Sequence, residues 1–383
     1  MKKIIILLIL CILIIPFSVY AEDDLIPNAV SGVLMEEETG TIIYEKEKDK
    51  QVAVASMTKM VAQIIILESI ESKKIKWDDV VTVSKNASDM GGSQIYLAAN
   101  EKMTVRDLFK GISMASANDA VVAMAEYISG TEDKFVKKMN DKVKSLGLKN
   151  TVFKNSTGLD EEGHFSSAYD MAIIAKELLK HEEILKFSSV YEDYLRTDTP
   201  NKFWLVNTNK LIHSYPGSDG LKTGHTDNAK YCIAATAKRD GMRLIAIVLG
   251  EEDAKVRNEE TSKLLDYGFN LKQVNIIKKK EKVVKKITLE KSNKKEIKIY
   301  PKNDVVVLKD KGIQNKKYVT KIKINKVNLP LKKNDKVGVI DVYENKKKIK
   351  SVDLIVKEKV EKETFINLLL NNLKNIPRGI MNE

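Results

Sequence analysis

The chain has 383 residues, of which 43% are hydrophobic, so it is long enough for two domains and a sizeable buried core. Its formal net charge is +12, and the excess comes from residues 271–360, where 28 Lys and no Arg stand against 10 Asp and Glu. Lys without Arg favours a diffuse attraction to anionic surfaces over the paired phosphate contacts that Arg makes with nucleic acid. We therefore expect anionic lipid or cell-wall polymer as the binding partner of this region, with a solvated Lys-rich surface that binds nothing as the alternative.

The first 21 residues predict a secretory signal peptide. Lys2 and Lys3 precede an apolar run from Ile4 to Ile15, and Val19–Ala21 supplies a small-residue cleavage site. An uncleaved N-terminal anchor is the alternative. We therefore expect an exported protein, whose mature chain keeps only Cys232 and forms no internal disulfide.

The next elements predict a hairpin followed by helices. Residues 30–45 contain two apolar runs around a turn at Thr39-Gly40, and residues 52–70 form an apolar run typical of a helix. Residues 78–186 are mostly helical in pattern, with Thr104 and Thr131 as expected N-caps.

Strands return after this helical region. Residues 219–224 and 231–250 predict a strand and then a hairpin that turns at Asp240-Gly241, and residues 253–270 predict a closing helix. Strands at both ends with helices between them indicate an α/β domain over residues 22–270, in which one sheet is interrupted by a helical insert.

The composition changes near Leu271, which predicts a domain boundary. Over residues 271–360, Ile and Val alternate with Lys in short runs, which predicts a small all-β domain of the sandwich type.

Residues 361–383 predict a terminal amphipathic helix. Ile366, Leu369, Leu370 and Leu373 share one face, and the apolar stretch is shorter than the roughly 20 residues that a membrane-spanning helix needs. We expect this helix to lie in the membrane interface, with a helix docked on the protein's own surface as the alternative.

Ser56 and Lys59 are candidate catalytic residues at the start of the apolar helix. Positions three apart share a helix face, so the hydroxyl and the amine can meet, and the first turn offers free N–H groups. Lys59 can accept a proton only when neutral, which requires its pKa to fall about three units from about 10.4. The same spacing recurs at Ser292 and Lys295 in the Lys-rich region, so the pair alone is weak evidence.

Two further motifs strengthen the pair. Ser116-Ala117-Asn118 in the helical region offers a hydroxyl relay and an amide, and Lys222-Thr223-Gly224 begins an apolar strand. The Lys and Thr suit a substrate carboxylate, and the Gly lets a ligand approach the backbone. Ser-x-x-Lys, Ser-x-Asn and Lys-Thr-Gly, in that order and on those elements, closely match the motif set of β-lactamases and penicillin-binding proteins.

The chain resembles the low-molecular-mass penicillin-binding proteins that are D-alanyl-D-alanine carboxypeptidases. The resemblance covers nearly all of it and rests on the stretches ETGTIIYEK, ASMTKM, GGSQIYL, GISMASANDA, LGLKNTVFKNSTGL, FSSAYDMA, DGLKTGHTDNAKYC and LLDYGF. It implies a β-lactamase-like antiparallel sheet with a helical insert, then the family's β-rich domain and amphipathic membrane anchor in residues 271–383.

The resemblance implies a serine-type reaction on a peptidoglycan stem peptide that ends in D-Ala-D-Ala, with β-lactams as acylating inhibitors. Ser56 would be acylated by the penultimate D-Ala carbonyl, and water would then cleave the acyl-enzyme. Lys59 would be the base, Ser116 would relay the proton to the leaving amine, and Asn118 would position Lys59 and the substrate amide.

The resemblance also implies how the substrate is held. Lys222 and Thr223 would bind the terminal carboxylate, and the N–H groups of Ser56 and His225 would form the oxyanion hole. Arg257 would assist the carboxylate, with an ordinary surface arginine as the alternative.

Other residues carry lesser expectations. We expect no metal or other cofactor, because the four His residues lack paired metal-ligand spacing. Asp170 is expected to be a helix cap rather than a catalytic group. Lys230 departs from the family, which commonly has Gly there, and it would change the strand's rim or add charge near the substrate.

Three alternatives stay open on the sequence alone. A class A β-lactamase needs a Glu that activates the deacylating water within Glu-x-x-Leu-Asn, and here residues 182–185 are followed by Lys186. A transpeptidase or endopeptidase would use the same motifs. A non-catalytic wall-binding protein would act through its basic β domain.

Overall fold

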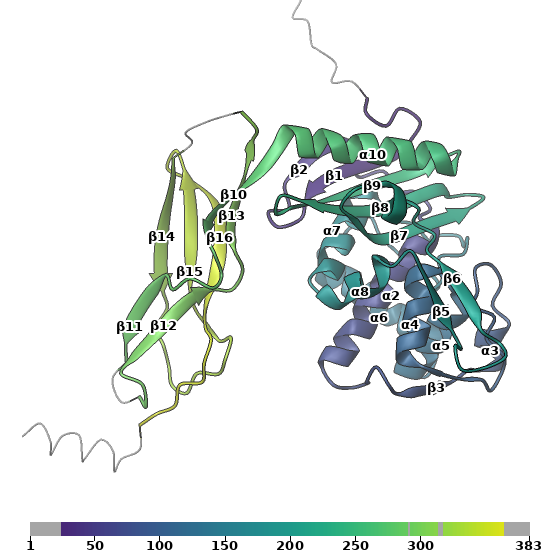
Figure 1. Cartoon of the computed structure of the whole chain (residues 1–383), viewed down its shortest axis with the longest axis horizontal. Coiled ribbons are helices and arrows are strands. Elements are labelled where there is room, and N and C mark those ends of the chain that lie inside the picture. Colours follow the sequence, from purple (N-terminus) through teal and green to yellow (C-terminus); the bar gives the residue numbers. More distant parts are fainter. Residues whose placement is uncertain (1–23, 290–291, 313–316, 364–383) are drawn as a thin grey trace, which may run out of the picture.

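The computed structural model describes residues 24–289, 292–312 and 317–363, which form two parts that lie side by side (Figure 1). The first part is built on a five-stranded antiparallel sheet with the order β2-β1-β9-β8-β7. Its strands are β1 (Ser31–Glu36), β2 (Ile42–Lys46), β7 (Ser218–Thr226), β8 (Lys230–Arg239) and β9 (Met242–Glu251). The sheet is completed only when the chain returns at β7, so the predicted insertion of helices into one sheet is confirmed.

Both faces of this sheet are covered. Ile245 and Ile247 of β9 belong to the larger core, whereas Leu244 and Ala246 belong to the core beneath α10 (Ala254–Leu271). Successive side chains of a strand point to opposite faces, so a strand buried on both sides is apolar throughout. This is why β9 is a continuous apolar run in the sequence.

The inserted helices cover the face opposite α10 (Figure 1). Helix α2 packs against α4, α5, α6 and α7 and is buried along most of its length, so no amphipathic stripe marks it in the sequence. The longer helices are α2 (Lys59–Glu71), α4 (Val105–Met114), α5 (Asn118–Ser129), α6 (Glu132–Ser145) and α7 (Ala168–Leu179). The short elements are α3 (Lys85–Ser88), α8 (Leu185–Ser188) and α9 (Leu211–Ser214), the strand pair β3 (Val80–Thr82) and β4 (Lys102–Thr104), and the strand pair β5 (Glu192–Leu195) and β6 (Phe203–Val206).

The second part confirms the predicted all-β region, because its described residues form strands and loops. In β12 (Glu296–Pro301), Ile297 and Ile299 are buried while Glu296 and Lys298 are exposed. The other strands are β10 (Lys272–Lys278), β11 (Lys285–Thr288), β13 (Val305–Asp310), β14 (Tyr318–Ile324), β15 (Lys336–Glu344) and β16 (Lys347–Val356). They form a five-stranded sheet, β11-β12-β16-β15-β14, and a two-stranded sheet, β10-β13, around a core of their own.

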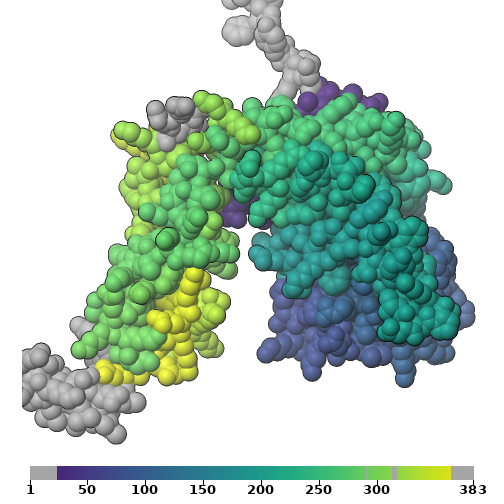
Figure 2. Space-filling model, in the orientation of Figure 1, coloured from purple at the N-terminus to yellow at the C-terminus, as the bar shows by residue number. Residues whose placement is uncertain are grey.

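The two parts touch where α10 leads into β10 (Figures 1 and 2). Val274 and Leu308 pack against the core beneath α10. Lys350 of β16 also reaches Glu38 in the β1–β2 turn, with 3.3 Å between the amine and a carboxylate oxygen. The all-β part is therefore in contact with the first sheet through both apolar and charged groups.

The predicted helix caps are confirmed in two of three places. The hydroxyls of Thr104 and Thr131 accept hydrogen bonds from backbone N–H groups of the first turns of α4 and α6. The expectation for Asp170 is wrong, because the hydroxyl of Ser167 caps α7 instead. Asp170 lies in the first turn, where its buried carboxylate accepts a 2.7 Å hydrogen bond from the Thr151 hydroxyl.

Two predicted segments fall largely or wholly outside the described residues. These are the signal peptide (residues 1–21) and the terminal helix (residues 361–383), of which the structure describes the first three residues. Within the described part of the chain, no helix has both the length and the apolar composition that crossing a membrane requires.

Candidate active site

Ser56 and Lys59 lie on the turn that leads into α2. We predicted one helix with Ser56 in its first turn, but Ser56 lies in a 3-10 turn (Ala55–Thr58) and α2 begins at Lys59. Tighter winding is common at helix starts, and here it follows a left-handed backbone at Ala55 (φ 46°). The side chains meet as predicted, with Lys59 Nζ 2.7 Å from Ser56 Oγ.

Lys59 is completely buried, which is unusual for a lysine. Burial disfavours the charged form and holds the pKa of Lys59 well below its ordinary value; the positive charge of Lys222 acts in the same direction, and the carboxylate of Asp119 opposes both. The predicted role of Lys59 as a base requires a neutral amine beside Ser56, and the buried environment favours the neutral form.

The carbonyl of Thr157 is the second partner of Lys59, at 2.6 Å from Nζ. It lies in the loop of residues 155–158, which also touches the backbone before Ser56. Gly158 has φ 81°, and a Cβ there would lie 2.0 Å from the carbonyl oxygen of Ala55, so only glycine fits. This loop therefore holds both the amine of Lys59 and the turn that carries Ser56.

The Ser-x-Asn motif lies where α4 leads into α5: Ser116 is in the connection and Asn118 is the first residue of α5. Ser116 has a left-handed backbone (φ 63°), and its buried hydroxyl has no hydrogen-bond partner among the described residues. The Asn118 amide donates to the Gly91 carbonyl at 2.7 Å, while its own carbonyl oxygen is likewise without a partner. Two buried polar atoms thus keep unused hydrogen-bonding capacity, which is typical of a site that binds a ligand.

Lys222 lies on β7, where its amine is buried and donates to the Thr223 carbonyl at 2.8 Å. Burial lowers the pKa of Lys222 to about 7, and the nearby guanidinium of Arg257 adds to this effect. The side chain of Thr223 donates to the hydroxyl of Thr208 at 2.7 Å.

Gly224 brings β7 close to the nucleophile. A Cβ at Gly224 would lie 2.7 Å from the Val54 carbonyl oxygen and 3.2 Å from the Ser56 nitrogen, so a larger residue would push the strand away from Ser56. We predicted that this glycine lets a ligand approach the backbone. The structure gives a second reason, which is the close approach of the β7 backbone to the backbone of residues 54–56.

Arg257 is a buried residue on α10 rather than a surface arginine. Its Nη2 donates to Asn258 Oδ1 at 2.9 Å, and burial lowers the pKa of its guanidinium. His225 follows Gly224 on β7 and is exposed. Its ring lies against the ring of Tyr231, with 4.1 Å between the ring centroids.

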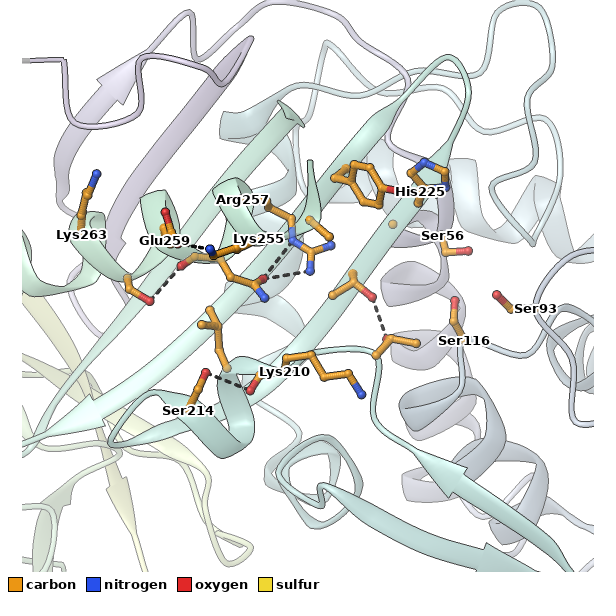
Figure 3. A pocket seen from close by; sticks show the side chains of 18 residues that line it. Ser56, Ser93, Ser116, Lys210, Ser214, His225, Lys255, Arg257, Glu259 and Lys263 are labelled. Carbon is orange, nitrogen blue, oxygen red and sulfur yellow. Dashed lines mark hydrogen bonds and ion pairs between the residues drawn. The ribbon is translucent and has the colours of Figure 1, made fainter. Parts of the chain in front are cut away.

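These residues surround one pocket of about 830 Å³ (Figure 3). Ser56, Ser93 and Ser116 gather at one end, β7 forms the middle, and α10 lines the other end. The buried residues Lys59, Asn118 and Lys222 adjoin this pocket, because Lys59 hydrogen-bonds to Ser56 and the other two lie within two residues of Ser116 and Thr223. The arrangement combines a nucleophile, a basic amine and cationic groups for a carboxylate.

Lys230 does not line this pocket. It has a left-handed backbone (φ 55°), and its amine lies 3.3 Å from Glu252. Among the residues that the structure describes, no cluster of three or more His, Cys, Asp or Glu side chains is suited to hold a metal ion.

Two family models match the chain. Residues 20–253 match the family of D-alanyl-D-alanine carboxypeptidases, and residues 271–362 match the C-terminal domain of penicillin-binding protein 5. The D-alanyl-D-alanine carboxypeptidase DacF of Bacillus subtilis is 45% identical over 379 residues, which are 96% of this chain and 97% of that one. The chain belongs to the D-alanyl-D-alanine carboxypeptidase family.

Solved structures of penicillin-binding proteins share the fold. Penicillin-binding protein 5 of Haemophilus influenzae has a TM-score of 0.69 at 31% identity, over 88% of this chain and 98% of its own. Penicillin-binding protein D2 of Listeria monocytogenes, in an ampicillin-bound form, has a TM-score of 0.57 at 32% identity, over 63% of this chain and 98% of its own. Membership of this family of serine hydrolases agrees with the resemblance drawn from the motifs.

Sequence reasoning missed three residues of the site. The Thr157 carbonyl and Gly158 act through the backbone, so their side chains carry no chemical signal. The LGLKNTVFKNSTGL stretch contains both and was recognised only as a family resemblance. Thr208 has no motif of its own, and only the folded sheet brings it to Thr223.

Proposed function

We propose that this chain removes the terminal D-alanine from peptidoglycan stem pentapeptides through an acyl-enzyme on Ser56. The observation that carries the proposal is the 2.7 Å contact between Ser56 Oγ and the buried amine of Lys59. The relative from Bacillus subtilis is named for the same activity.

In the first step, neutral Lys59 takes the proton of Ser56 Oγ, and the oxygen attacks the carbonyl carbon of the penultimate D-alanine. The N–H groups of Ser56 and His225 bind the oxyanion that develops. The close approach of Gly224 to the Ser56 nitrogen supports this pair, because it brings β7 alongside the nucleophile.

In the second step, the C–N bond breaks and terminal D-alanine leaves. Lys222 and Thr223 hold its carboxylate with help from Arg257, and the unpartnered hydroxyl of Ser116 passes the proton taken up by Lys59 on to the leaving amine. The unpartnered carbonyl oxygen of Asn118 accepts the N–H of the substrate amide.

In the third step, Lys59 accepts a proton from the water that attacks the acyl-enzyme, the ester bond to Ser56 Oγ breaks, Lys59 returns the proton to this oxygen, and the shortened peptide is released. β-Lactams present a reactive carbonyl and a carboxylate to the same groups, and we propose that they acylate Ser56 as well. Cell-wall maturation outside the cytoplasmic membrane is the setting that the predicted signal peptide indicates.

We also propose that residues 361–383 hold the protein at the membrane surface as an amphipathic helix. The support comes from the sequence pattern of Ile366, Leu369, Leu370 and Leu373, since this segment lies almost entirely outside the described residues.

D-Alanine release from a stem pentapeptide tests the catalytic proposal. We expect Ser56→Ala to lower kcat at least about 1,000-fold, because the covalent step is lost. Ser292→Ala is the matched control, since Ser292 and Lys295 have the same spacing outside the pocket, and it should leave the rate unchanged. D-Alanine release that survives Ser56→Ala would overturn the proposal, and sustained nitrocefin turnover would favour a β-lactamase.

A further inference from the structure

His164 is a buried side chain that the proposed steps leave unused. Its Nε2 lies 2.8 Å from the Thr58 hydroxyl, and its Nδ1 accepts a hydrogen bond from the backbone N–H of Lys154, with 3.2 Å between the two nitrogens. Thr58 ends the 3-10 turn that carries Ser56, which we call the nucleophile turn. Lys154 leads into the loop of residues 155–158, which we call the base loop. One imidazole ring therefore contacts the nucleophile turn and the start of the base loop.

The two contacts fix the position of the ring proton. A backbone N–H can only donate, so Nδ1 of His164 is unprotonated, and the proton lies on Nε2, which donates it to Thr58. Burial lowers the pKa of His164 to about 4; the carboxylates of Asp160 and Glu161 oppose this effect, and the amine of Lys154 adds to it. At neutral pH the ring is therefore uncharged, and both of its nitrogens are used.

Thr58 does not perform the usual task of a threonine at its position. It precedes the first residue of α2, where a threonine hydroxyl ordinarily accepts a hydrogen bond from an N–H group of the first turn. Here the backbone of Thr58 is already helical, with φ −45° and ψ −38°, and its hydroxyl caps no N–H group of α2. The hydroxyl is instead bonded to His164, which is 106 residues away in the sequence. This contact anchors the nucleophile turn from outside the helix.

His164 is itself held in place beside the base loop. The next residue, Phe165, exchanges two backbone hydrogen bonds with Val152, each 3.0 Å long. The ring of His164 also packs against the ring of Phe153, with 5.3 Å between the ring centroids. His164 and the segment that leads into the base loop therefore form one unit, and the hydrogen bond to Thr58 connects this unit to the nucleophile turn.

We propose that His164 is a positioning residue that holds the nucleophile turn against the base loop through its hydrogen bond to Thr58. This inference rests on the proposed function, because the groups that His164 positions are the nucleophile and its base. The amine of Lys59 contacts both segments, with Ser56 Oγ of the turn at 2.7 Å and the Thr157 carbonyl of the loop at 2.6 Å. A shift of about 1 Å between turn and loop would disturb these contacts, and a misplacement of this size can lower a rate about 100-fold.

Two substitutions in the full-length protein separate the two nitrogens of the ring. In His164→Gln the amide nitrogen takes the place of Nε2 and keeps a donor for Thr58, whereas the amide of His164→Asn reaches only the position of Nδ1. With a stem pentapeptide, we expect His164→Asn to lower kcat for D-alanine release about 30-fold. The KM should change less than about twofold, because the groups that hold the carboxylate stay in place. His164→Gln should keep kcat within about threefold of wild type.

Thr58→Val tests the other end of the same hydrogen bond and leaves His164 in place, so it is informative even if substitution of His164 impairs folding. It removes the hydroxyl from a side chain of similar shape, and we expect the same loss of about 30-fold in kcat. Because the two residues act through one hydrogen bond, the double variant Thr58→Val/His164→Asn should lose no more than either single variant.

His181→Asn is the matched control. His181 is buried as well, and its Nδ1 lies 2.7 Å from the carboxylate of Glu71 at the far end of α2, outside the pocket. The substitution should leave kcat unchanged even though the loss of a buried contact costs stability, which urea unfolding measures for every variant.

Several results would show that this hydrogen bond does not position the nucleophile. These are equal losses of kcat in His164→Gln and His164→Asn, a wild-type kcat in Thr58→Val, losses that multiply in the double variant, or a loss in His181→Asn as large as in His164→Asn. In each of these cases the wild type still releases D-alanine, so the proposed function stands. A wild type that releases no D-alanine would instead overturn the proposed function and the inference with it.

Discussion

The amines of Lys59 and Lys222 are both removed from solvent within the same site, and the charge of each is disfavoured by a neighbouring cation. An unfolded chain would keep both amines protonated at neutral pH, because an exposed lysine has a pKa of about 10.4. The folded chain therefore gives up stability to obtain a neutral base beside Ser56. Such a trade between stability and activity is common at active sites.

Replacing Lys59 should reveal this trade. Between the lowered pKa of Lys59 in the folded state and about 10.4 in the unfolded state, the unfolded chain binds more protons, so this group destabilises the fold at neutral pH and does so less as pH rises. Lys59→Met should abolish D-alanine release yet raise the unfolding midpoint by roughly 5 °C, as a gain of about 2 kcal/mol would in a domain of this size. Calorimetry at pH 7 measures the unfolding midpoint. A lower midpoint in Lys59→Met would contradict the claim that the buried amine of Lys59 destabilises the fold.

The charge of Lys222 should appear in the pH dependence of kcat/KM. Rate rises with pH as Lys59 becomes neutral, and it should fall above about pH 7 as Lys222 loses the proton with which it binds carboxylate. Lys222→Arg keeps its charge, so the falling limb should move to higher pH even if the bulkier side chain lowers the rate. A falling limb that stays in place in Lys222→Arg would show that another group controls it.

At the scale of elements, the sequence predicted the strands and helices whose pattern is local. The β1–β2 hairpin, the caps at Thr104 and Thr131, the strand that carries Lys222 and the hairpin after it followed from apolar spacing and turn residues. Contacts between distant segments did not follow from the sequence, because one partner is a backbone group or a residue without a motif of its own. The Thr157 carbonyl on Lys59 spans 98 residues of sequence and involves no side chain of Thr157.

The start of α2 illustrates the same limit. The apolar run predicted a helix but could not place its first residue, because the left-handed backbone at Ala55 depends on the loop of Gly158 packed against it. The Ser-x-x-Lys spacing survives on the tighter turn because Ser56 and Lys59 still lie on one side of it. Side-chain chemistry was therefore predictable where backbone detail was not.

Gly158→Ala should test the contact between the two loops. The added Cβ would meet the Ala55 carbonyl at 2.0 Å, so we expect a loss on the order of 3 kcal/mol in the free energy of unfolding and about a 100-fold fall in D-alanine release as Ser56 shifts. Gly130→Ala is the matched control, because Gly130 has the same φ of 81° with open space around it.

Gly130→Ala should cost only about 1 kcal/mol, from backbone strain alone, and leave activity intact. Urea unfolding and D-alanine release measure both variants. Equal effects of the two substitutions would show that the Gly158 contact does not position Ser56.

At the scale of the whole molecule, the catalytic pocket and the all-β part have separate cores. All residues that line the pocket lie between Ser56 and Lys263, ahead of the all-β part. The all-β part and the tail beyond it are therefore expected to locate the enzyme rather than to take part in the reaction.

A variant that ends at Glu363 tests the proposed anchor. We expect it to move from the membrane to the soluble fraction on cell fractionation, because the amphipathic segment is gone, while D-alanine release stays at the wild-type rate. Unchanged membrane association would show that another part of the chain, such as the Lys-rich strands, holds the protein there.

Ser56 Oγ is the nucleophile on which every proposed step depends, and the acylation of Ser56 can be measured directly. The full-length protein is incubated with benzylpenicillin, digested with trypsin and mapped by mass spectrometry. We predict one covalent adduct, on the peptide of residues 51–59 that contains Ser56, and no adduct in Ser56→Ala. An adduct on any other peptide, or one that persists in Ser56→Ala, would contradict the assignment of Ser56 as the nucleophile.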